Sequence, residues 1–170
     1  MNNQIMIAFN QQINEELYSF YLYLAAAAEA DFQKLPGLAN WLQVQAKEEY
    51  DHALGFYNYL VKQNMKVEFL AIAKPTLAKT DPLSLLQQSL AHEQHITGCI
   101  QQLVALADQE QNIQAKDFLQ WYVEEQQEEE ESFAALLFKV EELGGPEHAF
   151  EKLEVELGQR TYHPSSILSR

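Results

Sequence analysis

A repeated pattern of acidic and other polar residues is the most informative chemical feature of this sequence. In each half of the chain, one glutamate is followed, after the same interval, by a polar pair spaced i and i+3. The first copy consists of Glu16, Glu49 and His52, and the second of Glu93, Gln126 and Glu129. Because residues at i and i+3 share one face of a helix, each pair would project to one side. The sequence therefore predicts an internal repeat that brings six polar side chains to one level.

These six residues interrupt four apolar stripes whose three- and four-residue spacing is typical of the buried side of a bundle helix. An unpaired carboxylate in such a position is costly and normally takes up a proton. No Lys or Arg stands in the four stripes, whereas two divalent cations would balance four carboxylates. An oxygen-rich set with one imidazole suits iron(II), manganese(II) or zinc(II). A structural zinc site would favour Cys and His, so we interpret the pattern as a di-iron carboxylate site in a helical bundle.

Long helices must position these residues, because Pro and Gly fall at only a few places. We expect helices at about 3–34, 38–64, 82–107 and 113–143, and a short fifth helix at about 146–158. Pro36 and Gly37 end the first segment, and Asp81 is a predicted N-cap with Pro82 at the first helical position. No segment shows sustained strand alternation, so the predicted class is all-α.

The connection at residues 65–80 is much longer than the other turns. When extended it reaches roughly 50 Å, and each long helix spans roughly 40 Å, so it can run the length of a bundle. Short turns make helices one and two antiparallel, and likewise helices three and four. We therefore predict a four-helix bundle with one long crossover, a single domain at 1–160 and an irregular tail at 161–170.

Composition restricts the partners and the compartment. The 170 residues are 47% apolar, enough for a sizeable core, and carry a formal net charge of −14. This charge excludes nucleic acid as an expected partner and favours cations. The longest apolar stretch, 17–28, is too short to cross a membrane. Cys99 is the only cysteine, which favours a reducing, cytoplasmic compartment, and we expect it to be a small buried apolar residue.

A second group of acids lies beside the first pattern. Glu48, Glu125 and Glu128 each stand one position away from a residue of the repeat. They are interpreted either as a third, weaker cation site or as part of a solvated acidic face, which is the usual state of a charge run. His92 and His95 flank Glu93 and are expected to point away from the stripe, as solvent or interface residues.

Several stretches of the chain resemble the ferritins, specifically the bacterial non-haem ferritins of the heavy-chain type. These stretches are residues 14–19 (NEELYS), 45–52 (QAKEEYDH), 118–130 (FLQWYVEEQQEEE) and 157–160 (LGQR). The likeness covers roughly residues 3–160. It implies a ferritin-like four-helix bundle with a short fifth helix, whose Phe150, Leu153 and Leu157 we expect to be buried against symmetry mates.

The resemblance also implies a ferroxidase centre, at which O2 or H2O2 oxidises Fe(II). In that centre Glu16, Glu49 and His52 would hold the first iron, and Glu93 and Glu129 would hold the second, with Glu49 bridging. Gln126 would hydrogen-bond on the dioxygen side. Tyr23 is either an electron donor or a core tyrosine with a satisfied hydroxyl, and Trp121 is either a donor or a packing residue.

The family further implies a third iron site at Glu48, Glu125 and Glu128, with help from Glu129. It implies a hollow homo-oligomer of 24 subunits that stores Fe(III) as a mineral and detoxifies iron, with Asp117 as a candidate channel residue. No haem is expected, because Tyr50 replaces the haem-ligating Met of bacterioferritins.

Four alternatives remain open from the sequence. They are a bacterioferritin-like protein, a mini-ferritin of the DNA-protecting kind, a di-iron oxygenase or peroxidase with an organic substrate, and a non-catalytic metal-bound scaffold.

Overall fold

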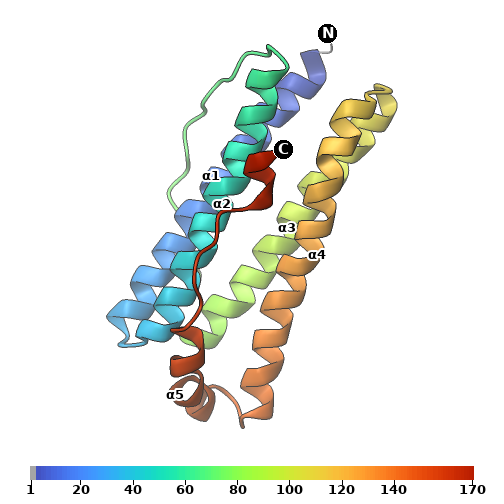
Figure 1. Cartoon of the computed structure of the whole chain (residues 1–170). Helices are drawn as coiled ribbons and strands as arrows, with labels where there is room; N and C mark the ends of the chain where they lie inside the picture. The colour runs from blue at the N-terminus through green and yellow to red at the C-terminus, as the bar shows by residue number, and fades with distance from the viewer. Residues whose placement is uncertain (1–2) are drawn as a thin grey trace.

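The computed structural model describes residues 3–170, which form helices and no strands (Figure 1). The elements are α1 (Asn3–Phe32), α2 (Pro36–Lys62), α3 (Pro82–Gln109), α4 (Ile113–Glu142), α5 (Pro146–Leu157) and the short 3-10 helix η1 (Ser166–Ser169). The predicted all-α class and the five α-helices are confirmed.

Two antiparallel hairpins, α1–α2 and α3–α4, make up the bundle, and a long crossover joins them. In Figure 1 the crossover is the green segment that returns along the outside of the first hairpin to the start of α3. Asn10 of α1 fixes its path, since its amide donates to the carbonyl of Lys66 at 2.9 Å and accepts from the backbone N–H of Glu68 at 2.7 Å. The predicted crossover topology is therefore confirmed.

Local chemistry explains where the helices begin and end. The Asp81 side chain caps α3 by accepting from the Ser84 N–H at 3.0 Å. Asn112 caps α4 in the same way, accepting from the Ala115 N–H at 3.0 Å. The second helix begins at Pro36 rather than at residue 38, because proline already has the backbone angle of a first helical turn.

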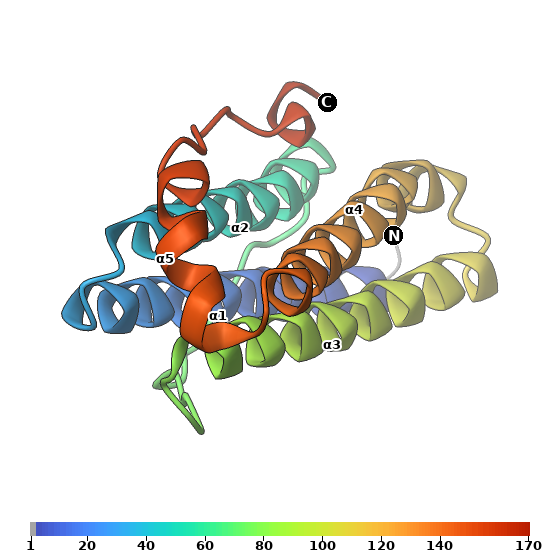
Figure 2. The ribbon, with the colours of Figure 1, turned by 90° about the horizontal axis from the view of Figure 1, so that it is seen from below.

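The fifth helix lies across one end of the bundle (Figure 2). The Glu154 carboxylate accepts from the backbone N–H groups of Gly37 at 2.6 Å and Leu38 at 3.1 Å, so α5 caps the start of α2. Gly37 allows this approach, since a Cβ at that position would come within 2.1 Å of the Glu154 carbonyl oxygen.

The apolar face of α5 is buried within this chain. Phe150, Leu153 and Leu157 are all almost inaccessible and pack in the same core cluster as α2 and α4. The expectation that these residues are buried against symmetry mates was therefore wrong. The open end of a four-helix bundle exposes apolar side chains, and α5 covers them within the same subunit.

The apolar core is divided into two clusters. One contains Leu42 and Phe133 and lies toward α5, and the other contains Phe9 and Phe56 and lies toward the opposite end. The polar residues of the repeat fall between the two clusters on every long helix. The bundle therefore has apolar packing at both ends and a polar layer in the middle.

The tail after α5 is extended apart from η1 and is tied to the bundle. The Asp51 carboxylate accepts from the Tyr162 hydroxyl and the Ser165 N–H, both at 2.8 Å, and Ile167 is buried. A single 3-10 turn, η1, lies within the segment that the sequence predicts to be irregular. None of the helices described for residues 3–170 has the length and apolar character needed to cross a membrane.

Candidate metal centre

The six residues of the repeat meet in the middle of the bundle. Each long helix contributes at least one of them, and none is more than 5% exposed. They are Glu16 on α1, Glu49 and His52 on α2, Glu93 on α3, and Gln126 and Glu129 on α4. The structure thus brings together the complete set that the repeat predicts.

Two groups of ligand atoms share one glutamate. Glu16, Glu49 and His52 form the first group, and Glu49, Glu93 and Glu129 form the second; within each group, one ligand atom per residue lies within 4.8 Å of the others. Glu49 belongs to both groups. A pair of cations placed in these groups would therefore have Glu49 between them.

Four atoms of the first group lack hydrogen-bond partners among residues 3–170. They are Oε2 of Glu16, Oε2 of Glu49, and both ring nitrogens of His52. The His52 nitrogens lie 3.4 Å from Glu49 Oε2 and 3.7 Å from Glu125 Oε1, near enough for ionic attraction but without hydrogen-bond geometry. Buried polar atoms are normally bonded, so this orphaned set has the chemistry of a metal site.

Burial and mutual repulsion perturb the acids strongly. Burial, reinforced by the neighbouring Glu49 charge, raises the pKa of Glu16 and of Glu129 to about 8. The same two causes, together with Glu129, raise the pKa of Glu93 well above its usual range. Without a cation, this cluster is accommodated by protonating several of its acids.

Glu49 is the exception among these acids, because its pKa is lowered. Burial, the largest single cause, acts to raise the pKa of Glu49, but the adjacent His52 and the hydrogen bond from Gln45 together lower it. Burial acts to lower the pKa of His52, but the neighbouring carboxylates of Glu49, Glu125 and Glu16 together raise it well above normal. The shared glutamate is therefore the ionised acid of the cluster.

Side-chain amides orient the ligands. Gln12 donates to Glu16 Oε1 at 2.8 Å, and Gln45 donates to both Glu49 Oε1 at 3.0 Å and Glu129 Oε2 at 2.6 Å. The sequence analysis did not predict these two roles. A signal was present, because each glutamine stands four residues before the glutamate that it orients, on the same helical face.

Comparison with known proteins identifies the fold and the family. A sequence profile described as a ferritin-like domain matches residues 7–143. This chain belongs to the ferritin family.

Individual ferritins agree with that assignment. The chain is 32% identical over 162 residues to a bacterial non-heme ferritin of Staphylococcus aureus strain USA300, covering 95% of this chain and 98% of that protein. It is 31% identical to the corresponding protein of Staphylococcus saprophyticus over 165 residues, covering 97% and 99%. A ferritin of Archaeoglobus fulgidus, engineered into a closed form by site-directed mutagenesis, superposes with a TM-score of 0.92 at 35% identity, covering 96% and 99%. Membership of the ferritin family supports iron storage as the function and iron as the metal.

The second ligand group of this ferritin-family chain is hydrogen-bonded. Tyr23 is fully buried, and its hydroxyl donates to Glu93. Gln126 donates to Glu93 Oε2 at 3.1 Å. Trp121 contacts the His52 ring at a centroid distance of 5.5 Å and donates to the Ser166 hydroxyl at 3.0 Å. Both aromatic residues thus lie beside the centre with their polar atoms satisfied.

The structure does not gather the three acids predicted for a third site. Glu125 groups with His52 and Glu129, whereas Glu128 is exposed and stands outside that group. Glu48 instead forms a 2.6 Å ion pair with Arg160. Burial nevertheless raises the pKa of Glu48, and the Arg160 charge only partly opposes this.

Arg160 is a residue whose place the sequence analysis did not predict. Its guanidinium donates to Gln45 Oε1 at 3.0 Å and to the Trp41 carbonyl at 3.2 Å, and it stacks on the Trp41 ring at 4.2 Å. Because Gln45 Oε1 accepts from Arg160, the amide nitrogen of Gln45 faces Glu49 and Glu129. The guanidinium thereby fixes which way this amide points.

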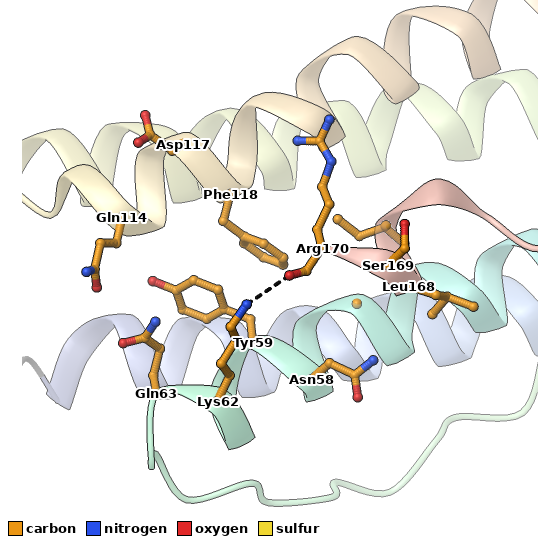
Figure 3. Close-up of a pocket in the computed structure, with 12 residues that line it drawn as sticks. Asn58, Tyr59, Lys62, Gln63, Gln114, Asp117, Phe118, Leu168, Ser169 and Arg170 are labelled. Carbon is orange, nitrogen blue, oxygen red and sulfur yellow. Dashed lines mark hydrogen bonds between the residues drawn. The ribbon is translucent and has the colours of Figure 1, made fainter.

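A cavity of about 600 Å³ lies apart from the metal centre (Figure 3). The end of α2, the start of α4 and the C-terminal turn surround it, and Lys62 Nζ donates to the Arg170 carbonyl at 2.9 Å across one side. Asp117, the candidate channel residue, lines this cavity. None of the lining residues belongs to the six of the centre.

Proposed function

We propose that this chain oxidises Fe(II) at a di-iron ferroxidase centre and stores the Fe(III) as a mineral inside a shell of 24 subunits. Glu16, Glu49 and His52 hold the first iron. Glu93 and Glu129 hold the second, and Glu49 bridges the two. Storage and detoxification follow from the same step, because it removes Fe(II) from solution.

One observation carries this proposal: two buried ligand groups share Glu49, and four polar atoms of the first group lack partners among residues 3–170. Two divalent ions match the charge of four ionised carboxylates. Iron binding then displaces the protons that the raised pKa values of Glu16, Glu93, Glu129 and His52 retain.

The electron balance is simple. Each Fe(II) gives up one electron, so a bound pair supplies two. These two electrons reduce O2 to H2O2 with the uptake of two protons, or reduce H2O2 to two water molecules with the uptake of two protons. Gln126 and Tyr23 keep Glu93 oriented through their hydrogen bonds.

A third iron position remains part of the proposal. Glu48, Glu125 and Glu128 are its candidate ligands, with Glu129 beside them. In this chain a cation there must compete with Arg160 for Glu48, so we expect it to be the weakest of the three positions. We place the protein in the cytoplasm, because Cys99 is its only cysteine.

Replacement of the bridging residue tests the catalytic part of the proposal. Glu49→Ala removes the ligand common to both groups, so the initial rate of Fe(III) formation by O2 should fall by about 100-fold. Glu141→Ala, an exposed acid on α4, is the matched control and should leave the rate unchanged. An unchanged rate in Glu49→Ala would exclude this centre.

Size-exclusion chromatography of the iron-loaded protein tests storage separately. Storage predicts a 24-subunit particle that carries many irons per chain, and Glu49→Ala should assemble as the unaltered chain does. A small dimer with two irons per chain would contradict storage and favour a di-iron enzyme with an organic substrate.

A further inference from the structure

Three potential metal ligands lie together on the α1/α3 side of the bundle, outside the six-residue centre. Glu15 extends from α1, and His95 and Cys99 extend from α3. His95 Nε2 lies 3.2 Å from Glu15 Oε2 and 3.6 Å from Cys99 Sγ. One ligand atom from each of the three residues lies within 4.8 Å of the others.

The helical spacing of His95 and Cys99 favours joint binding. Residues four apart stand one above the other on a helix, which is the arrangement by which two ligands on a single helix bind one zinc ion. Glu15 supplies the third ligand from the neighbouring helix. The trio is thus held by two long helices and does not depend on a loop.

The trio is open to solvent. His95 is 57% exposed and Glu15 is 39% exposed, and Cys99 is partly exposed. The expectation that Cys99 is a buried apolar residue was wrong. His92, expected to be a solvent or interface residue like His95, is instead half-buried and hydrogen-bonded to Ser19 at 2.7 Å.

The trio is also separate from the buried centre. A groove of about 360 Å³ between α1 and α3 adjoins it and is lined by Gln12, Glu15 and Cys99. Gln12 is nearly buried and turns its amide inward to Glu16. Glu15 and Glu16 are neighbours in sequence, but they serve different sides of α1.

We propose that Glu15, His95 and Cys99 form a surface site for one divalent transition-metal ion. A thiolate, an imidazole and a carboxylate together select zinc(II), cobalt(II) or iron(II) over magnesium and calcium, which prefer oxygen ligands alone. One thiolate and one carboxylate neutralise the charge of one divalent ion. Three protein ligands leave the fourth tetrahedral position to water.

Metal binding at this site must displace a proton. Burial, with the nearby charges of Glu15 and Glu16, raises the pKa of the Cys99 thiol to about 11. The thiol is therefore protonated at neutral pH until a cation replaces the proton. Binding releases that proton to solvent as the metal–sulfur bond forms.

Thiol labelling tests the site directly, because Cys99 is the only cysteine and no other residue contributes to the signal. The rate at which an aromatic disulfide reagent labels Cys99 is measured with and without Zn(II). At a Zn(II) concentration of about ten times the dissociation constant, labelling should slow about tenfold. Co(II) should give a thiolate charge-transfer band in the near ultraviolet, and Cys99→Ser should abolish that band.

Matched variants separate this site from the buried centre. Glu15→Gln and His95→Gln should each weaken the protection by Zn(II), whereas His163→Gln, an exposed histidine in the tail, should not. Glu49→Ala should keep the protection, so the result does not depend on the ferroxidase centre. Labelling that Zn(II) leaves unchanged, or protection that persists in both Glu15→Gln and His95→Gln, would overturn the proposal.

Discussion

The two helical hairpins carry polar residues at the same spacing, yet they hold them in different states. The α1–α2 hairpin contributes Glu16, Glu49 and His52, which together include four buried atoms without hydrogen-bond partners among residues 3–170. The α3–α4 hairpin contributes Glu93, Gln126 and Glu129, whose carboxylates accept hydrogen bonds from Tyr23, Gln126 and Gln45. The repeat therefore sets the level of the site, and the hydrogen-bond partners distinguish its two positions.

The difference arises from two substitutions between the copies. Where the first copy has Glu49, the second has Gln126, and where the first has His52, the second has Glu129. Gln126 donates to Glu93, whereas the corresponding Glu49 can only accept, and Oε2 of Glu49 and Oε2 of Glu16 lack partners among residues 3–170. Glu49 and His52 are instead held as an ionised pair. We infer that the first position, which has the imidazole and the four unpartnered atoms, binds iron more tightly than the second.

The largest expected effect is the loss of Fe(II) affinity when a ligand of the first hairpin is removed. His52→Ala removes the only imidazole from the centre, and the affinity for the first Fe(II) under anaerobic conditions should fall by more than about 100-fold. Glu129→Ala should affect mainly the second binding step. Titration calorimetry with Fe(II) measures both steps, and equal losses in the two variants would remove the distinction between the hairpins.

A second prediction concerns pH and metal binding. Glu16 and Glu129 have folded pKa values of about 8, above the ordinary value of 4.5. Stability that comes from raised carboxyl pKa values is present below the unfolded pKa and is lost as pH rises through the folded pKa. The melting temperature of the metal-free protein should therefore fall between pH 4.5 and about 8.

Divalent metal should reverse this trend, because it replaces the protons. The increase in melting temperature that saturating metal produces should grow with pH over the same interval. A metal-induced increase that is independent of pH would show that the acids are already ionised without a cation.

A third prediction makes the second hairpin more like the first. Gln126→Glu introduces a further buried acid and removes the donor to Glu93, so the metal-free protein should lose about 1–3 kcal/mol of stability. Gln127→Glu makes the same chemical change at the exposed neighbouring position and should have little effect. Chemical denaturation of the metal-free proteins measures both. A Gln126→Glu protein as stable as the unaltered chain would show that Gln126 does not stabilise the acids of its hairpin.

The smallest effect is expected at the link between the tail and the centre. Arg160→Lys keeps a positive charge but loses the planar fork that bonds Gln45 and Glu48 together. Gln45 would then lose its fixed orientation, and the initial oxidation rate should fall by only a few fold. Arg170→Lys, at the end of the tail, is the control. A rate in Arg160→Lys equal to that of the control would show that Gln45 stays oriented without the guanidinium.

Much of the fold follows from local chemistry. Pro36 and Asp81-Pro82 predict the helix ends to within a few residues, because their effects act on the adjacent backbone. The repeat predicts which six residues meet, because the bundle imposes one period on all four helices. Neither argument needs contacts between distant segments.

The other features of the fold and of the site depend on contacts between segments that are distant in sequence. The burial of Phe150 within its own subunit and the pairing of Arg160 with Glu48 both require the path of the chain after α4, which no helical period sets. For the same reason, spacing left open a third cation site that includes Glu48, against which Arg160 lies. Gln12 was missed because a glutamine in a helix usually faces water.

The most direct test is a crystal soaked anaerobically in Fe(II), with iron located by anomalous scattering. We predict two iron peaks in each subunit, one among Glu16, Glu49 and His52 and one among Glu49, Glu93 and Glu129, with a Glu49 oxygen near both. Absence of iron from this layer, or a single peak that Glu49 does not contact, would contradict the account.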